Sequence, residues 1–432
     1  MADTDKTDAD DAVQTSPLRV GSWVLYDLAN TVYIATVTFV FTPYAKEVLG
    51  GLSGHGITNF LSMVAAGLLV PFFGALVDTT GRTSRYLIVT TGLCITALAG
   101  WSLDWGGGWL LLCFFAANLC YNLALLFYNA LLTSVAPPER AGRVSGLGVG
   151  VGYLGTILVL VSLLTLPAGE RSFFLIAAAL FAVLALPCLL FVRERRAAPR
   201  VGGPLGPILR EANGRLLETV RTLPRHPALM WFLIGNFFLV DVLNTAVLYF
   251  ADFTKDVFAA KAETGVDLFG ATFQGEAGID EFMQIAGLCL NVIAMLVGIS
   301  IGRWTDRAPL AVLRVSAVGL LFALAGGAWF GGVSPIGYLC TLVALGAFGL
   351  TGIWTAGRKV VVLLAPPDKI GQYFGLYGIT VKLSVIGGVV YGLVHDEFGS
   401  KPAMLAQSSQ LLLGLLCLLM VRLPSNRVAA AQ

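Results

Sequence analysis

Charge is scarce in this chain. Of its 432 residues, 12% are charged and 56% are apolar, whereas a soluble domain carries about 25% charged residues. A soluble protein of this composition would expose large apolar patches and aggregate, so the composition indicates a membrane protein. The formal net charge of +2 leaves no basic face to neutralise phosphates, which argues against a nucleic-acid partner.

Residues that form disulfides, bind metals or perform catalysis are also sparse. The seven cysteines lie in apolar runs without a C-x-x-C spacing, so neither a disulfide framework nor a zinc site is indicated. The three histidines fall near predicted loops, and no H-E-x-x-H, Walker or Rossmann glycine motif is present. We therefore expect no enzyme, no cofactor and no metal, and any pumping must use an ion gradient or exchange.

Long apolar runs are what the chain has in abundance. A spanning helix needs about 20 mostly apolar residues, and twelve stretches qualify. They lie near 22–44, 57–77, 86–103, 108–132, 144–166, 173–192, 228–250, 282–301, 310–330, 335–362, 373–394 and 403–421. The sequence therefore predicts an all-α membrane protein with twelve transmembrane helices.

The longest link between spans divides them six from six. The predicted organisation is a disordered tail over 1–21, an N-terminal six-helix bundle over 22–192, a linker over 193–226, a C-terminal bundle over 227–423 and a tail over 424–432. Residues 207–221 of the linker fit either a short amphipathic helix on the membrane surface or a solvated stretch. Residues 259–280 form a polar loop on the other side.

The positions of lysine and arginine predict the orientation. With the N-terminus in the cytoplasm, 22 of the 28 lie in cytoplasmic loops, tails and adjoining helix ends, five lie on the opposite side, and Lys382 lies inside a span. This bias predicts a multi-pass protein of the inner cell membrane with both termini cytoplasmic. We expect a monomer in the lipid bilayer.

An internal repeat relates the two halves. Ala136-Pro-Pro-Glu-Arg-Ala-Gly142 has a counterpart 229 residues later, Ala365-Pro-Pro-Asp-Lys-Ile-Gly371. Each copy lies where a cytoplasmic loop enters a helix, at the fourth-to-fifth and the tenth-to-eleventh junctions. Two parallel six-helix halves with a central cytoplasmic linker are the arrangement of major facilitator transporters.

A motif between the second and third spans resembles the G-x-L-a-D-x-x-G-R signature of major facilitators. It reads Gly74-Ala-Leu-Val-Asp78-Thr-Thr-Gly81-Arg82-Thr-Ser-Arg85, and a degenerate copy in the second half ends in Asp306-Arg307. Glycine permits close helix approach, and Asp78 is placed to cap a neighbouring helix N-terminus. We expect it to dock on the cytoplasmic end of helix eleven, near the 365–371 loop. The resemblance implies a gating role for these residues. The alternative is an ordinary basic cytoplasmic loop.

A narrower resemblance is to the vacuole effluxer-like (autophagy-related permease-like) branch. The first helix carries Trp23-Val-Leu-Tyr26-Asp27-Leu-Ala-Asn30-Thr31-Val-Tyr33, similar to W-x-L-Y-D-x-A-N-S-x-Y of that branch, with Thr31 in place of serine. The stretch from Tyr128 to Gly148 and the late Phe374-Gly-Leu-Tyr377 also match. The compact length resembles prokaryotic members. The resemblance implies efflux of amino acids.

Polar residues inside spans are the candidate substrate and ion-coupling site. Asp241 and Lys382 lie at similar depths, near mid-membrane, and we expect them to form an ion pair. Release of Lys382 to a substrate carboxylate would let Asp241 accept a proton. The alternative is a purely structural pair. Asn244 follows Asp241 in the same span.

The first half supplies the remaining candidates. Asp27, with Asn30 and Tyr33, lies nearer the cytoplasm and is either a coupling carboxylate or an interfacial one. Three asparagines, Asn118, Asn122 and Asn129, fall within about 40° of each other on helix four. They line a wet cavity or hydrogen-bond a neighbouring helix, and we favour the cavity. Gly148, Gly152 and Gly155 share one face of helix five and predict tight packing.

These observations predict a secondary active transporter that moves a small polar solute by alternating access. The resemblance favours an amino acid or related zwitterion and export, and the pair of Asp241 with Lys382 suggests protons as the coupling ion. The alternatives are a transporter-like receptor and a polytopic membrane enzyme, such as a lipid transferase. An enzyme should cluster acid, base or metal-binding residues at one interface, and the sequence contains no such cluster.

Overall fold

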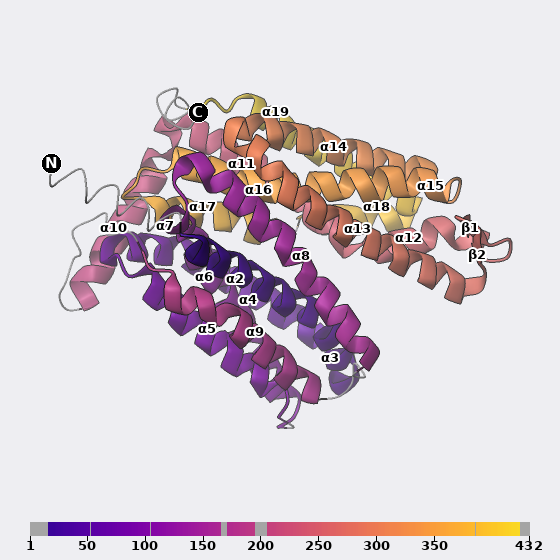
Figure 1. Cartoon of the computed structure of the whole chain (residues 1–432), viewed down its shortest axis with the longest axis horizontal. Coiled ribbons are helices and arrows are strands. Elements are labelled where there is room, and N and C mark those ends of the chain that lie inside the picture. The colour runs from indigo at the N-terminus through magenta and orange to yellow at the C-terminus, as the bar shows by residue number, and fades with distance from the viewer. Residues whose placement is uncertain are drawn as a thin grey trace.

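The computed structural model describes residues 16–51, 53–103, 105–165, 171–194, 205–384 and 386–423. It consists almost entirely of helices arranged as two bundles (Figure 1). The tail over 424–432, most of the tail over 1–21 and part of the linker lie outside the described residues. Within the described part, α2 begins at Pro17, inside the predicted disordered tail and five residues before the expected start of the first span.

The N-terminal bundle contains the first six spans. The first is α2 (Pro17–Thr36), which continues through a π-helical turn (Val37–Phe41) into α3 (Thr42–Leu49). The others are α4 (Ser53–Thr80), α5 (Thr83–Gly100), α6 (Gly107–Ala130) with the short α7 (Leu132–Val135), α8 (Ala141–Thr165) and α9 (Ser172–Phe191). The predicted glycine face of helix five is confirmed, because a Cβ at Gly155 would lie 2.8 Å from the backbone oxygen of Leu28. Helices α2 and α8 therefore pack backbone to backbone.

The C-terminal bundle contains the other six. Its spans are α11 (Pro227–Leu248), α13 (Gly275–Arg307), α14 (Pro309–Phe330), α16 (Gly346–Leu364), the pair α17 (Ile370–Leu383) and α18 (Ile386–Phe398), and α19 (Ser400–Leu419). Helix α12 (Phe250–Phe258) extends α11, and α15 (Pro335–Tyr338) with a π-helical stretch (Leu339–Leu345) precedes α16. A two-stranded antiparallel hairpin, β1 (Val266–Leu268) and β2 (Ala271–Phe273), joins α12 to α13.

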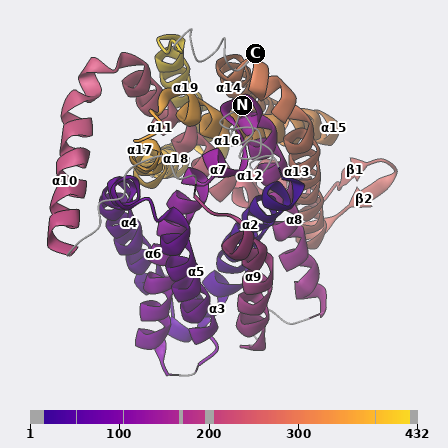
Figure 2. The same cartoon turned by 60° about the vertical axis from the view of Figure 1, so that its left-hand side comes forward.

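The linker between the bundles contains α10 (Leu205–Thr222). Figure 2 shows this helix at the edge of the molecule, beside α4 and α17. Its Ile208 and Ala212 are buried against Ala75 and Leu76 of α4, while Thr219 donates a hydrogen bond of 2.5 Å to Gln372 of α17. Helix α10 therefore contacts one helix of each bundle.

The proline pairs of the repeat end the helices that precede them. Helix α7 ends at Val135 and α16 ends at Leu364, in each case directly before the Ala-Pro-Pro sequence. The residue before a proline is disfavoured in the α conformation, and Ala136 and Ala365 accordingly have extended ψ angles of 135° and 130°. The repeat thus gives both halves the same break, followed by a new helix N-terminus.

The observed spans differ from the expected ones in three places. Within the described residues, eleven helices are long and apolar enough to cross a membrane. The twelfth expected span is α5, an 18-residue helix with Arg85 in its first turn. Helix eleven is broken near Ser384, so the expected span 373–394 consists of α17 and α18. The predicted loop over 259–280 contains the hairpin and the start of α13, which begins seven residues earlier than expected.

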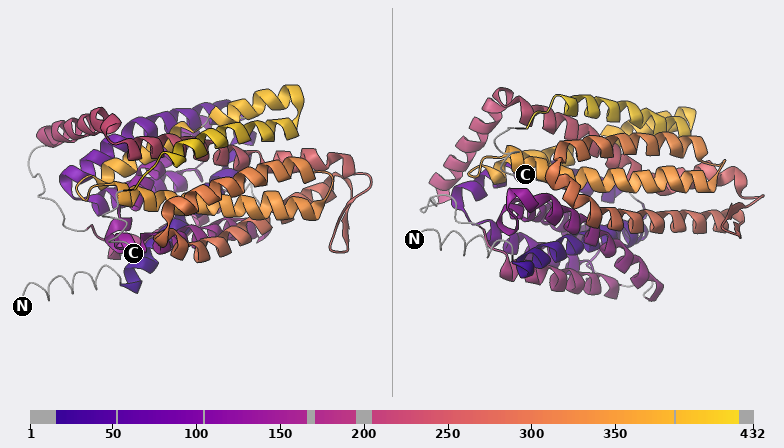
Figure 3. Two further views of the ribbon diagram at one scale, coloured as in Figure 1. Left: turned by 90° about the horizontal axis from the view of Figure 1, so that it is seen from above. Right: turned by 45° about the horizontal axis from the view of Figure 1, so that its top comes forward.

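The bundles meet at one end of the molecule and diverge toward the other. Figures 1 and 3 place α10, the start of α2 and the end of α19 at one end, here called the linker end, and β1–β2 at the other, the hairpin end. Helix α8 packs on α13 and α4 packs on α17 across the boundary. At the linker end these contacts are intimate: a Cβ at Gly142 would lie 2.8 Å from the backbone nitrogen of Asp306.

Candidate functional site

Asp78 joins the bundles at the start of α17. Its Oδ1 accepts a 2.7 Å hydrogen bond from the backbone N–H of Gly371, and its Oδ2 accepts one of 2.8 Å from the N–H of Gln372. Unsatisfied N–H groups and the macrodipole make a helix N-terminus a favourable site for a carboxylate. The predicted docking of Asp78 on the 365–371 loop and the helix that follows it is therefore present in this structure.

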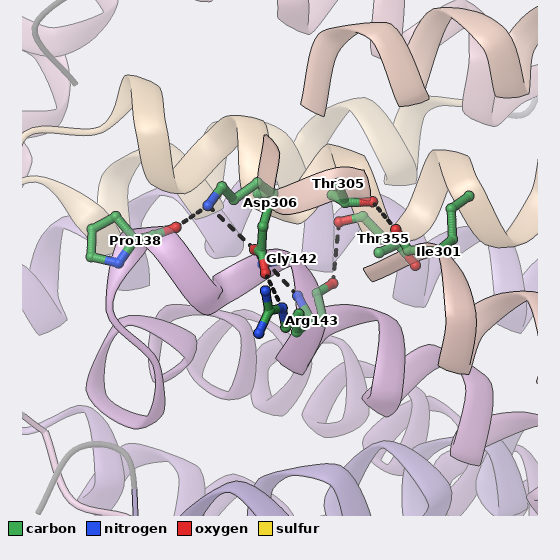
Figure 4. A network of polar contacts seen from close by, with 9 residues as sticks. Pro138, Gly142, Arg143, Ile301, Thr305, Asp306 and Thr355 are labelled. Atoms are coloured by element: carbon green, nitrogen blue, oxygen red, sulfur yellow. Dashed lines mark hydrogen bonds and ion pairs between the residues drawn. The ribbon is translucent and has the colours of Figure 1, made fainter. Parts of the chain in front are cut away.

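Asp306 makes the equivalent contact from the C-terminal bundle to the start of α8 in the N-terminal bundle (Figure 4). Its Oδ1 accepts from the backbone N–H groups of Gly142 and Arg143, at 2.7 and 3.3 Å. The guanidinium of Arg143 lies 3.2 Å from the other carboxylate oxygen. The ammonium group of Lys359, which is fully buried, lies 3.5 Å from Oδ1 and donates to the backbone oxygen of Pro138.

The internal repeat explains why there are two such contacts. Gly142 and Gly371 are equivalent positions of the repeat, and each binds the aspartate of the gating motif of the other half. Both positions need glycine, because a Cβ at Gly142 would lie 2.6 Å from Oδ1 of Asp306 and a Cβ at Gly371 would lie 2.9 Å from Oδ1 of Asp78. The two bundles are therefore joined at the linker end by polar groups and bare backbone, which part more readily than an interlocked apolar surface.

The other residues of the gating motif lie around this boundary. Gly81 has a φ of +58°, which favours glycine, and it turns the chain from α4 into α5. Arg82 precedes α5, Arg85 lies in its first turn, and both are exposed, as is Arg307 at the end of α13. These arginines surround the linker end without entering the contact between the bundles.

The central contact between the bundles is an ion pair that the sequence does not predict. The guanidinium of Arg358 on α16 contacts both carboxylate oxygens of Asp27 on α2, at 2.8 and 3.3 Å. Both side chains are buried. The guanidinium carbon also lies 5.7 Å from the ring centroid of Trp23 and 5.6 Å from that of Tyr128, so two aromatic faces add cation–π attraction.

The interfacial interpretation of Asp27 is therefore wrong. Arg358 and Lys359 lie near the end of an apolar run. From the sequence they therefore count among the basic residues at the cytoplasmic helix ends. Their burial becomes visible only when α2 and α13 are placed beside α16. The sequence signal for a cation beside Asp27 was the aromatic motif of the first helix with Trp23 and Tyr26, together with Tyr128. Aromatic faces beside a buried carboxylate favour a cation there.

The expected ion pair between Asp241 and Lys382 is absent. Among the described residues, no side chain donates to the carboxylate of Asp241, which is 1% exposed and faces the backbone N–H groups of Ile386 and Gly387. Lys382 is also buried, and a Cβ at Gly67 of α4 would contact its Cβ at 3.8 Å. The two side chains share a depth but leave α11 and α17 in different directions: Lys382 lies toward the N-terminal bundle, and Asp241 lies toward Gly387.

Asn118 of helix four binds a neighbouring helix, and Asn122 binds mainly within its own. Asn118 donates to Asn59 and Ser62 of α4, at 3.1 and 2.7 Å. Asn122 donates to the backbone oxygen of Asn118 at 2.7 Å and lies 3.6 Å from the sulfur of Met63 on α4. The expected cavity-lining stripe is wrong for these two residues, because the α4–α6 contact covers that face. Asn129 is buried as well, and its amide oxygen has no partner.

The remaining candidates lie on α2 and α11. Asn30 is 3% exposed with neither amide atom hydrogen-bonded, and the hydroxyl of Tyr33 has no partner. The ring of Tyr33 stacks on that of Tyr121, with centroids 4.5 Å apart. Asn244 donates to the hydroxyl of Ser384 at 3.1 Å. The unpartnered groups of Asn30 and Tyr33 sit on the same helix as Asp27, farther from the linker end.

Several known proteins are similar to this chain in sequence. The chain is 24% identical over 407 residues to the uncharacterised MFS-type transporter YxiO of Bacillus subtilis, which covers 88% of this chain and 89% of that one. It is 25% identical over 304 residues to autophagy-related protein 22-2 of Aspergillus clavatus, covering 63% and 47%. It is 22% identical over 375 residues to a multi-drug resistance efflux pump PmrA homolog of Lactococcus lactis, covering 82% of each.

Solved structures and a family model agree with these relatives. The human organic anion transporter MFSD10 superposes with a TM-score of 0.70 at 14% identity, covering 94% of this chain and 99% of that one. FucP in its outward conformation superposes with a TM-score of 0.68 at 14% identity, covering 95% and 100%. The predicted fold class is thus confirmed. Residues 28–389 match the model described as Major Facilitator Superfamily, so the chain belongs to this superfamily and is a transporter rather than an enzyme.

Proposed function

We propose that this protein is a secondary active transporter that exports a small zwitterionic solute, such as an amino acid, by alternating access. The observation that carries the proposal is the one-sided boundary between the bundles. At the linker end they are joined by Asp78, Asp306 and the buried pair of Asp27 with Arg358, and they diverge toward the hairpin end. Breaking these polar contacts would open the linker end.

We propose that the linker end faces the cytoplasm of a cell with this protein in its inner membrane. The lysine and arginine bias supports this orientation. Single cysteines at Thr272 in the hairpin and at Arg221 in α10, introduced into a variant without native cysteines, should react with a membrane-impermeant maleimide from opposite sides. We expect labelling of residue 272 in intact cells and of residue 221 only in inverted vesicles. Labelling of both from one side would contradict the topology.

The unpartnered ammonium of Lys382 supports a solute with a carboxylate. Its helix α17 forms part of the boundary with α4, so the residue lies where a bound solute would touch both bundles. A buried ammonium without a partner is costly, and a substrate carboxylate would supply the missing charge. Similarity to a relative named as an efflux pump and to the autophagy-related proteins supports export and the amino-acid class.

The test is solute movement in proteoliposomes. A thermal-shift screen first identifies solutes that stabilise the purified protein, since a ligand at about 100 times its Kd adds about 2.7 kcal/mol. The best solutes are then loaded as radiolabelled compounds, and counterflow is followed with and without a pH gradient. Lys382→Met should lose affinity for carboxylate-bearing solutes, whereas Lys369→Met at the linker end should not. Binding without counterflow would favour the receptor alternative.

Asp78→Asn should slow transport while leaving solute affinity within a few-fold. The amide keeps one acceptor oxygen but places an NH₂ group against an N–H donor, so at least one of the two hydrogen bonds to α17 is lost. Loss of a charge-assisted bond costs about 1.5–3 kcal/mol, which favours separation of α4 from α17. Turnover and solute Kd are measured separately. A large loss of affinity with normal turnover would assign Asp78 to the substrate site instead.

A further inference from the structure

Asp241 lies in a pocket of oxygen atoms at the break in helix eleven. Helix α17 ends at Leu383, and α18 begins at Ile386. A Cβ at Gly387 would lie 2.5 Å from the hydroxyl of Thr245, 3.0 Å from Oδ2 of Asp241 and 3.0 Å from Oε1 of Gln407. Three side-chain oxygens from α11 and α19 therefore converge in front of one glycine of α18.

Among the described residues, no side chain donates a hydrogen to the Asp241 carboxylate or to Oε1 of Gln407. The carboxylate is buried and faces the backbone N–H groups of Ile386 and Gly387 at the start of α18, whereas Oε1 of Gln407 is buried without a donor. The amide of Gln407 is fixed in orientation, because its Nε2 donates to the backbone oxygen of Gly387 at 3.0 Å. The hydroxyl of Thr245 is also committed, since it donates to the backbone oxygen of Asp241 at 2.8 Å. Both groups therefore face the carboxyl group as acceptors.

Only a hydrogen carried by the carboxyl group itself can join these acceptors. A protonated carboxyl has one O–H donor, and an ionised one without a cation in a buried site is strongly disfavoured. We propose that Asp241 and Gln407 form the proton-binding site of this transporter, with the Asp241 O–H donating to Oε1 of Gln407. The proposal rests on the secondary active transport proposed above, adds the proton as its coupling ion, and replaces the expected role of Lys382 as the partner of Asp241.

No neighbouring cation substitutes for the proton. The ionisable side chains on the α-helices packed against α11 are Tyr373, Tyr377 and Lys382 on α17, Tyr391, His395, Asp396 and Glu397 on α18, Lys401 and Cys417 on α19, Arg358 and Lys359 on α16, and Asp252, Lys255 and Asp256 on α12. Five basic side chains on these helices bind groups other than Asp241. Arg358 binds Asp27, Lys359 binds Asp306 and Lys255 binds Asp280. His395 binds Asp256, and Lys401 binds the backbone of Gly331. Lys382 makes no ion pair with Asp241 among the described residues.

The position of the site links the proton to the shape of helix eleven. When the proton leaves, the carboxylate repels Oε1 of Gln407 and is attracted by the N–H groups at the start of α18, at Ile386 and Gly387. Helix α18 joins α17 through the break, and α17 carries both the Asp78 contact and Lys382. Gain or loss of the proton would thus change the angle between the two halves of helix eleven.

Infrared spectroscopy tests the site without any transport assay. In pH-jump difference spectra of the purified full-length protein, we expect the C=O band of a protonated carboxyl group. This band should be absent from Asp241→Asn. It should be retained in the control Asp252→Asn, which alters an exposed aspartate of α12. Gln407→Leu should shift this band to higher frequency because the carboxyl loses its acceptor, whereas Gln410→Leu on the same helix should not. An identical band in the wild type and in Asp241→Asn overturns the proposal, as does a band unmoved by Gln407→Leu.

Transport assays distinguish the proton site at Asp241 from the proposed function as a transporter. In proteoliposomes, Asp241→Asn should lose accumulation driven by a pH gradient and keep solute exchange. Accumulation that persists in Asp241→Asn overturns the proton site while the transporter assignment stands. Absence of all solute movement in the wild type would instead contradict the proposed function, and the infrared result would still decide the proton site.

Discussion

Arg358→Met is expected to abolish or strongly slow transport and to open the linker end. The substitution leaves the carboxylate of Asp27 buried beside Trp23 and Tyr128 without its cation. Removing one partner of a buried ion pair costs about 3–5 kcal/mol. Because the pair exists only while the bundles touch, this penalty falls on the arrangement described here. It should shift the conformational equilibrium by about 10²- to 4 × 10³-fold.

Two further variants distinguish a contact between bundles from general stabilisation. Arg314→Met is the matched control, since Arg314 donates to the backbone oxygens of Leu418 and Val421 within the C-terminal bundle, and it should leave the linker end closed. The double variant Asp27→Asn with Arg358→Met removes both charges and should regain part of the closed population. Maleimide reactivity of a cysteine at Ser145, which lies in the boundary, reports opening. Equal reactivity in the wild type and Arg358→Met would show that the pair does not hold the bundles together.

Gly74→Ala is expected to favour the opposite conformation. A Cβ at this position would lie 2.3 Å from the backbone oxygen of Gly371 and 2.9 Å from its carbonyl carbon, so the α4–α17 contact cannot form without backbone movement. Overpacking of this kind costs about 1–3 kcal/mol, and it acts only on the arrangement in which the two helices touch. We expect the linker end to become about 5- to 150-fold more accessible, with slower turnover.

Gly67→Ala provides the comparison for this second variant. Gly67 lies two helical turns away on the same face of α4, where a Cβ would meet only the Cβ of Lys382 at an ordinary 3.8 Å. It should therefore transport like the wild type. The readout is again maleimide labelling at Ser145, combined with the rate of counterflow. Similar behaviour of the two alanine variants would mean that the close approach at Gly74 does not control opening.

The sequence by itself determined the number of spans, their division into two halves and the position of the Asp78 contact at the linker end. These features depend on local or periodic properties: apolar runs of sufficient length, prolines that end helices, and a repeat that places Gly142 and Gly371 at equivalent helix starts. Asp78 could be assigned to the start of helix eleven because a carboxylate and a helix N-terminus attract each other wherever they meet. The motif and the repeat were sufficient to pair them.

The tertiary structure alone decided which buried charges meet. Equal depth suggested Asp241 with Lys382, but depth leaves the direction of each side chain around its helix undetermined, and the two point to different neighbours. Asp27 instead pairs with Arg358, 331 residues away, and Asp241 faces Gln407 across a helix break near Ser384 that the continuous apolar run conceals. Such contacts depend on helix rotation and packing between distant segments, and a single sequence records neither.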